Sequence, residues 1–143
     1  MNQKIYILLP VHNRKDITTM FVKMLVNQTY KNYHLVLIDD GSTDGTVDSI
    51  QEYLNDITVI TGDGNLWWGG ALHQGYLWVK NQLKDSSDAV LIINDDVLID
   101  IDFLEKGLKI LQGCSSKTLV VAENFKQESK DILIDRAVYI NWN

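Results

Sequence analysis

The chain has 143 residues, a net charge of −6 and a hydrophobic content of 45%, which together suit one soluble globular domain with a sizeable core. The acidic balance argues against a nucleic-acid-binding surface, because such a surface shows clustered lysine and arginine. The single cysteine, Cys114, excludes an internal disulfide and is expected to be inert. No apolar run reaches the about 18 residues of a transmembrane helix, and no signal peptide precedes the first predicted strand, so we expect a cytoplasmic protein.

Predicted strands and helices alternate along the chain. Apolar, β-rich runs predict strands at residues 4–9, 33–38, 57–60, 90–93 and 118–122, and the first should stop at Pro10, which cannot donate to a ladder. Apolar residues at helical spacing predict helices at residues 17–28 and 102–112. Two more helices are predicted, one from a cap at Thr43 or Asp44 to about Leu54 and one after the glycine-rich residues 62–70. This alternation favours an α/β fold with a mostly parallel, Rossmann-like sheet flanked by helices on both faces.

The fourth predicted strand ends in Asn94, Asp95 and Asp96. Its unbroken apolar run indicates a strand covered on both faces, and open α/β sheets bind ligands at the carboxyl ends of such strands. Adjacent carboxylates attract a cation, and hard divalent ions such as Mg²⁺ take one or two carboxylates plus substrate phosphates. The pattern fits either a metal bridge to a phosphorylated substrate or an acidic turn that caps the helix beginning near Asp102.

The loops after the first and second predicted strands should meet the acidic strand end at one edge of the sheet. Residues 10–14 offer backbone groups, an imidazole, an amide and a cation, and residues 39–45 offer carboxylates and hydroxyls. A carboxylate can accept the N–H of a uracil or thymine ring or hold a ribose hydroxyl. We favour such a role for Asp40 over that of a turn residue, and we favour helix capping for Asp44.

Two adjacent tryptophans, Trp67 and Trp68, lie between glycines. Paired indoles on flexible backbone suit a sugar or base surface, and Gly69 would let the chain approach a diphosphate closely at a helix start. The other interpretation places one tryptophan in the core and the other over the loop. The stretch is neither a P-loop nor a dinucleotide-binding fingerprint.

Residues 5–14, 37–46 and 91–97 together resemble the inverting family 2 glycosyltransferases of the GT-A fold in order and spacing. Residues 64–71 resemble the Gly-Asn-x-Gly-x-x-Gly-Gly stretch of the rhamnosyl- and galactofuranosyltransferase-like branch. The resemblance implies that Asp96 ligates a Mg²⁺ or Mn²⁺ bridging the diphosphate, whereas Asn94 stands where many members carry an acidic residue or threonine. It implies a nucleotide-sugar-binding site made of Pro10, Val11, His12, Asn13, Asp40, Asn65, Trp68, Gly69 and Asp95.

The same resemblance implies a hexosyltransferase that uses a UDP- or dTDP-sugar and transfers the sugar, with inversion, to a glycan or lipid-linked acceptor. Such enzymes serve bacterial cell-envelope polysaccharide biosynthesis, in the cytoplasm or peripherally at the inner face of the membrane. Family members usually run well past 143 residues, and their second half supplies the acceptor site and the general base. We therefore expect residues 1–143 to be one GT-A donor-binding domain, truncated before the acceptor half, with an unknown base.

Other interpretations follow from the same residues. A catalytically incomplete nucleotide-binding module is the main alternative. A sugar-phosphate nucleotidylyltransferase would need a glycine-rich loop after the first strand, and residues 10–16 contain no glycine. A phosphoacceptor receiver domain would need an acidic pair at the same place. The apolar, extended tail at residues 132–142 invites pairing with another chain, so a homodimer built through this edge is also an expectation.

Overall fold

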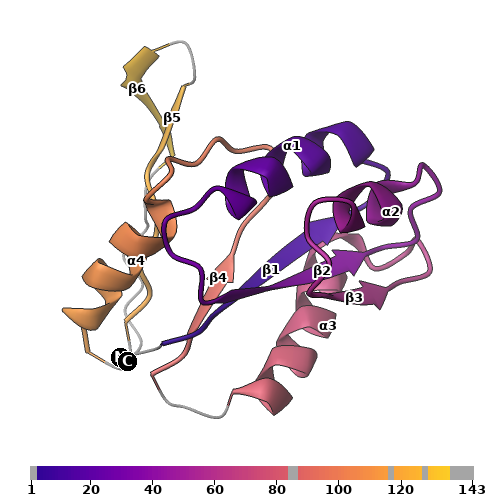
Figure 1. The fold of residues 1–143 in the computed structure, drawn as a ribbon, viewed down its shortest axis with the longest axis horizontal. Coiled ribbons are helices and arrows are strands. Elements are labelled where there is room, and N and C mark those ends of the chain that lie inside the picture. The colour runs from indigo at the N-terminus through magenta and orange to yellow at the C-terminus, as the bar shows by residue number, and fades with distance from the viewer. Residues whose placement is uncertain (1–2, 84–86, 116–117, 127–128, 136–143) are drawn as a thin grey trace. The chain divides into compact units, whose positions relative to one another are not determined.

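A four-stranded parallel sheet forms the centre of the first part of the molecule (Figure 1). The computed structural model describes residues 3–83, 87–115, 118–126 and 129–135, and the chain divides into two compact units, residues 1–104 and 105–143. In the first unit the strand order is β3-β2-β1-β4, and every neighbouring pair is parallel. The strands are β1 (Ile5–Val11), β2 (Tyr33–Asp39), β3 (Ile57–Thr61) and β4 (Ala89–Ile92).

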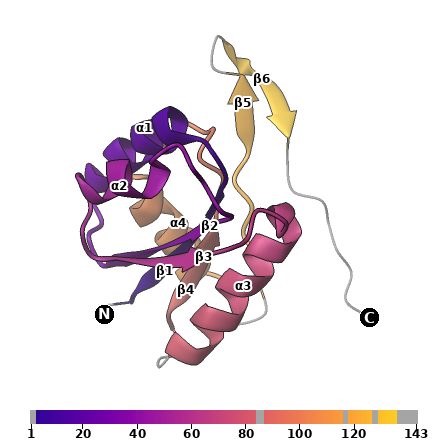
Figure 2. The ribbon, with the colours of Figure 1, turned by 90° about the vertical axis from the view of Figure 1, so that its right-hand side faces the viewer.

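Helices lie on both faces of this sheet, as the sequence predicts. The prediction that the strand before Asn94 is covered on both faces is wrong, because Val90 and Ile92 of β4 are 42% and 55% exposed. Helices α1 (Lys15–Val26) and α2 (Thr46–Gln51) lie on one face, and α3 (Trp67–Gln82) lies on the other (Figure 2). Against α3 the sheet presents Tyr6, Leu8, Val36 and Ile38, which pack with Ala71 and Val79. The alternate strand residues, which face α1 and α2 because side chains alternate along a strand, include the fully buried Ile7, Leu9, Leu35 and Leu37.

Helix α3 packs very closely on the sheet because Gly75 has no side chain. A Cβ at Gly75 would lie 3.0 Å from Cδ1 of Ile38 and 3.3 Å from Cδ2 of Leu8. The helix begins at Trp67, inside the glycine-rich stretch that the sequence predicts as a loop. Because α3 packs closely on the sheet and begins at Trp67, its first turn lies at the carboxyl edge of the sheet.

The prediction that the first strand stops before Pro10 is wrong. Strand β1 continues through Pro10 to Val11, and Pro10 pairs in register with Ile38 of β2. The oxygen of Leu8 accepts the N–H of Ile93 beside β4, so Pro10, two residues later, turns its nitrogen toward the same side. Strand β4 has ended at that point, so the missing N–H costs no ladder bond.

The predicted strand at residues 118–122 is also wrong, because these described residues form no strand. Thr118 bonds back to Ser115, with 3.2 Å between its nitrogen and the Ser115 oxygen, and Leu119 is 72% exposed. β-branched and apolar residues form a strand only where a neighbouring strand is available to pair with them.

The second unit contains most of α4 (Phe103–Gln112) and an antiparallel pair, β5 (Asn124–Lys126) and β6 (Ser129–Asp135). The extended tail that the sequence predicts is thus a strand as far as Asp135, and residues 136–143 lie outside the described part. Homodimer formation through this tail stays a prediction. No helix among the described residues combines the length and apolar character needed to cross a membrane.

Candidate functional site

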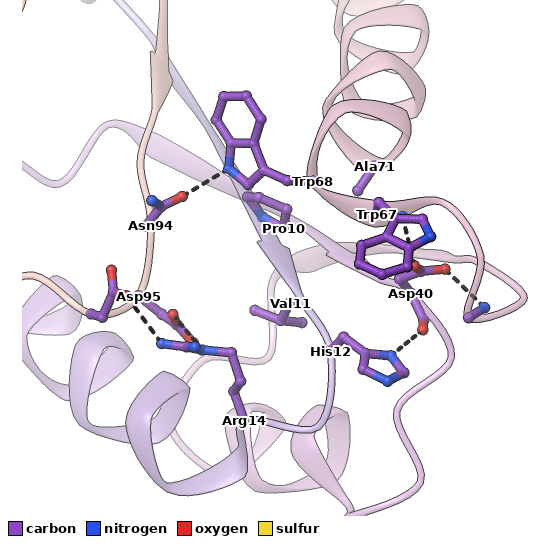
Figure 3. A pocket seen from close by; sticks show the side chains of 12 residues that line it. Pro10, Val11, His12, Arg14, Asp40, Trp67, Trp68, Ala71, Asn94 and Asp95 are labelled. Atoms are coloured by element: carbon purple, nitrogen blue, oxygen red, sulfur yellow. Dashed lines mark hydrogen bonds and ion pairs between the residues drawn. The ribbon is translucent and has the colours of Figure 1, made fainter.

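A cleft of about 480 Å³ opens at the carboxyl edge of the parallel sheet (Figure 3). The loops after β1, β2 and β4 gather there, as the sequence predicts, and the first turn of α3 completes the wall. The lining residues are Pro10, Val11, His12, Arg14, Asp40, Gly64, Trp67, Trp68, Ala71, Asn94, Asp95 and Asp96.

The Asp40 carboxylate organises the loop between β3 and α3. Its Oδ1 accepts the N–H of Gly64 at 2.8 Å, and its Oδ2 accepts the N–H groups of Leu66 and Trp67 at 2.9 and 3.0 Å. Burial alone would raise the pKa of Asp40, but the three N–H donors and the nearby His12 together lower it below the usual value. Asp40 therefore remains ionised and fixes the start of α3 at the cleft.

The loop passes so close to Asp40 that only glycine fits at position 62. A Cβ on Gly62 would lie 2.5 Å from Oδ1 of Asp40 and 2.5 Å from Cδ1 of Leu66. Gly64 adopts a φ of +89°, in the left-handed region that favours glycine. These two glycines let the backbone amides converge on one carboxylate.

Both tryptophans of the first turn of α3 face outward. Trp67 is 81% exposed and Trp68 is 58% exposed, so the interpretation that places one of them in the core is wrong. Trp67 has a φ of +56°, which is strained for a bulky residue, and its N–H bond to Asp40 helps to hold that conformation. The indole N–H of Trp68 donates to Oδ1 of Asn94 at 3.0 Å and so joins α3 to the loop after β4.

Arg14 links the loop after β1 to the acidic residues after β4 (Figure 3). Its Nε donates to both oxygens of Asp95, at 2.9 and 3.1 Å, and the Thr18 hydroxyl donates to Oδ2 of that carboxylate at 2.7 Å. The Asp95 side chain is 3% exposed, whereas Asp96 is 58% exposed and meets Nη2 of Arg14 at 3.3 Å. The hydrogen bond to Asp95 is the main cause of a raised pKa of Arg14.

The acidic pair does not cap the helix that follows it. The carboxylates of Asp95 and Asp96 meet Arg14, whereas the N–H of Leu104 in the first turn of α4 is bound by Oε1 of Gln28 at 3.0 Å. Gln28 is buried, and its Nε2 also donates to the oxygen of Asp100 at 2.8 Å. This amide therefore ties the segment after the acidic pair to the end of α1.

The loops after β1 and β2 are joined by side chains that stabilise the rim. Asn13 has a φ of +50°, which asparagine adopts more readily than most residues. Its Oδ1 accepts the N–H of Thr43 at 2.8 Å, and its own N–H donates to the Ser42 hydroxyl at 2.8 Å. The His12 ring donates from Nδ1 to the oxygen of Asp40, which leaves Nε2 to accept from the Asn13 amide at 3.1 Å.

Asp44 has the capping role that the sequence favours. Its Oδ2 accepts the N–H of Lys15, the first residue of α1, at 2.9 Å. Its Oδ1 accepts the N–H and the hydroxyl of Thr46, the first residue of α2, at 3.0 and 2.5 Å. The hydroxyl of Thr46 is the main cause of a lowered pKa of Asp44. One carboxylate thus caps two helices.

Most of the residues predicted for the site lie on the cleft wall. They are Pro10, Val11, His12, Asp40, Trp68, Asp95 and Asp96. Asn13, Asn65 and Gly69 are not among the lining residues, and a Cβ on Gly69 would meet no protein atom within 4 Å. The sequence names Arg14 as the cation of the loop after the first strand, but it does not predict the pairing of Arg14 with Asp95 and Asp96. Thr18 is not predicted for the site, because its contact with Asp95 depends on the orientation of α1.

The cleft wall offers a divalent cation few protein ligands. The described residues contain no group of three or more His, Cys, Asp or Glu side chains arranged for a metal ion. Asp96 nevertheless presents an exposed carboxylate to the cleft. Mg²⁺ and Mn²⁺ accept one carboxylate together with phosphate oxygens and water, so the donor set suits a cation that arrives with a diphosphate.

Residues 6–132 match the model of glycosyl transferase family 2. An uncharacterized glycosyltransferase of Haemophilus influenzae is 31% identical over 109 residues, which are 75% of this chain and 42% of that protein. The poly(ribitol-phosphate) beta-glucosyltransferase of Bacillus spizizenii is 38% identical over 52 residues, 35% of this chain and 8% of that protein. The matched part is less than half the length of each relative.

Solved structures share the fold at low sequence identity. The mannosyltransferase PcManGT from Pyrobaculum calidifontis, in complex with GDP-Man and Mn²⁺, aligns with a TM-score of 0.63 at 18% identity, over 75% of this chain and 32% of that one. S. aureus TarS in complex with UDP aligns with a TM-score of 0.63 at 21% identity, over 78% of this chain and 32% of that one. These similarities confirm the predicted GT-A α/β fold.

Proposed function

The chain belongs to glycosyl transferase family 2, and from this premise we propose that its cleft binds the nucleoside diphosphate of a UDP- or dTDP-sugar donor. One observation carries the proposal. The loops after β1 and β4 bring a guanidinium and an exposed carboxylate to one cleft, and the first turn of α3 brings two exposed indoles to it. A nucleotide sugar has matching parts: a flat base, a charged diphosphate and a sugar ring.

The cleft residues fall into two sets, one proposed to bind the base and ribose and one proposed to bind the diphosphate and sugar. Pro10, Val11 and His12 border the end of the cleft next to Asp40, where we place the base and ribose. Asp40 acts there by holding the loop that carries the indoles, and we propose that the lone pair left on its Oδ1 accepts a ring N–H of the base. Asn13 lies outside the cleft lining and contributes by joining the loops after β1 and β2.

The sugar and diphosphate lie toward α3 and the acidic pair. The exposed Trp68 offers an apolar face to a sugar ring, and its N–H is already fixed by Asn94. Asn65 lies just before α3 and Gly69 lies in its first turn, and we assign both to the sugar side. The similarity of residues 64–71 to the rhamnosyl- and galactofuranosyltransferase-like branch supports this assignment.

Asp96 would hold Mg²⁺ or Mn²⁺ beside the diphosphate, because it is the exposed member of the acidic pair. A bound ion would stabilise the charge of the departing diphosphate. The exposed Asp96 meets Arg14 at 3.3 Å, a contact of little net energy in water.

The proposed reaction is inverting transfer of a hexosyl group to a hydroxyl of a glycan or lipid-linked acceptor of the bacterial cell envelope. The partial similarity to a poly(ribitol-phosphate) glucosyltransferase supports this class of acceptor. A base must take the proton of the attacking hydroxyl. Asp40 is a poor base because N–H donors stabilise its charged form, and Asp95 is occupied by Arg14 and Thr18.

A nucleotide-binding module without turnover is the second candidate. It is favoured because Asp40 and Asp95, the two buried carboxylates of the cleft, already accept donors from the protein. We therefore describe residues 1–143 as a donor-binding domain, and a transfer assay with a panel of envelope acceptors separates the two candidates.

The binding proposal is tested by calorimetry with UDP and dTDP in Mn²⁺ and in EDTA. Binding in EDTA should be at least about tenfold weaker than in Mn²⁺, and Asp96→Asn should weaken Mn²⁺-dependent binding by at least about tenfold, or about 1.4 kcal/mol. Asp56→Asn is the matched control because its side chain is 98% exposed at the opposite edge of the sheet. Equal affinity in EDTA, or an unaffected Asp96→Asn variant, would refute the role of the metal. Absence of nucleotide binding under all conditions would refute the proposal itself.

A further inference from the structure

Arg14 makes two contacts of very different quality with the acidic pair. Toward Asp95 it uses Nε, which reaches both carboxylate oxygens at 2.9 and 3.1 Å, and that carboxylate is 3% exposed. The Thr18 hydroxyl adds a third donor at 2.7 Å. The Arg14 side chain is 36% exposed, but breaking this pair is costly because the buried Asp95 charge would keep only the Thr18 donor.

The contact with Asp96 is weaker. Nη2 of Arg14 lies 3.3 Å from Oδ2 of Asp96, and the Asp96 side chain is 58% exposed. Ion pairs in water have little net energy because both partners are well solvated when apart. Asp96 can therefore exchange its partner while the guanidinium stays anchored on Asp95.

From this difference we propose that Arg14 is a diphosphate-binding residue that exchanges one anion for another. Without a diphosphate it binds Asp96. When a diphosphate and a divalent cation enter together, the cation takes Asp96 and the outer N–H groups of Arg14 bind a phosphate oxygen. This inference rests on the proposed function, because it needs a diphosphate in the cleft.

The exchange predicts opposite effects on the two ligands. Arg14 competes with a cation for Asp96, so its removal should strengthen binding of Mn²⁺ alone. Arg14 also attracts the diphosphate, so its removal should weaken binding of UDP without metal. A residue that only supports the local structure would weaken both, because the cleft would lose its shape.

Two variants separate these effects from a loss of folding. Arg14→Lys keeps a cation for Asp95, but a single ammonium group cannot span Asp95 and Asp96 as the planar guanidinium does. The double variant Arg14→Gln with Asp95→Asn replaces the buried ion pair by two neutral amides and leaves no unpaired buried charge. Lys15→Gln is the control, since Lys15 is exposed and lies outside the cleft lining.

The readouts are free Mn²⁺ by electron paramagnetic resonance without nucleotide, and UDP affinity by calorimetry in EDTA. In both variants we expect Mn²⁺ to bind about threefold more tightly and UDP about threefold more weakly, the size of effect that an exposed ion pair allows. Lys15→Gln should change either affinity by less than about twofold, and thermal melts check that each variant is folded.

Each outcome has a distinct meaning. Wild-type protein that binds UDP with Mn²⁺, together with variants in which both affinities fall or neither changes, overturns the exchange while the proposed function stands. Wild-type protein that binds no UDP under any condition overturns the proposed function and this inference with it.

Discussion

Replacing Gly62 with alanine tests whether the carboxylate of Asp40 shapes the cleft. The new Cβ would lie 2.5 Å from Oδ1 of Asp40, 2.5 Å from Cδ1 of Leu66 and 3.1 Å from the Asp40 Cα. The Leu66 methyl can rotate away, but Asp40 cannot move without stretching its 2.8 Å bond to the N–H of Gly64. The substitution should therefore displace the carboxylate and loosen the start of α3.

The expected cost is that of an overpacked site, about 1–3 kcal/mol of unfolding free energy. For a chain of this length, each kcal/mol lowers the melting temperature by roughly 3 °C, so the melting temperature should fall by roughly 3–9 °C. UDP affinity in Mn²⁺ should fall as well, because Trp67 and Trp68 begin the helix that the carboxylate holds.

Gly107→Ala is the matched control for this substitution. A Cβ on Gly107 would meet nothing within 4 Å, and the residue lies inside α4. Alanine in a helix interior is more favourable than glycine by up to about 1 kcal/mol, so this variant should melt slightly higher and bind UDP normally. If Gly62→Ala melts and binds UDP like the parent protein, or if both variants respond alike, Asp40 does not shape the cleft.

Further predictions concern the rest of the cleft and its supports. Trp68→Phe keeps an aromatic ring but loses the N–H to Asn94, and calorimetry should show UDP-sugar affinity falling about fivefold. Unchanged affinity would show that the Trp68 N–H does not contribute to donor binding. Asp44→Ala should lower the melting temperature at pH 7. The lowered pKa of Asp44 means that its stabilisation exists above the unfolded-state pKa, about 3.9, and is lost as pH falls through the folded-state pKa, so the two melts should converge in acid. A difference that persists at pH 2 would contradict this linkage. Gln28→Ala leaves the buried N–H of Leu104 unpaired and should cost about 2–3 kcal/mol in urea unfolding; a loss below about 0.5 kcal/mol would show that water replaces the amide.

Local patterns in the sequence determine the order and type of most elements. The helical spacing of apolar residues predicts α1, and Phe21 and Leu25 are buried as expected. Ile17 and Met20, which share that spacing, are nevertheless 39% and 52% exposed. The unbroken apolar run of β2 is buried within the sheet, as its pattern predicts. Polar residues directly after β1, β2 and β4 likewise predict the ligand edge, since parallel strands bring their carboxyl ends together. The family resemblance rests on these same strand ends.

Only the tertiary structure decides what each polar side chain at that edge contacts. Arg14 and Asp95 are 81 positions apart, and their pairing depends on β4 lying beside β1. The N–H groups that Asp40 binds exist as a cluster only after the loop from β3 has folded over it. Pro10 is tolerated inside β1 because the pairing of β1 with β4 ends at Leu8 and Ile92, so no residue of β4 needs a ladder N–H from position 10. Such contacts are set by the placement of distant segments, which no local periodicity encodes.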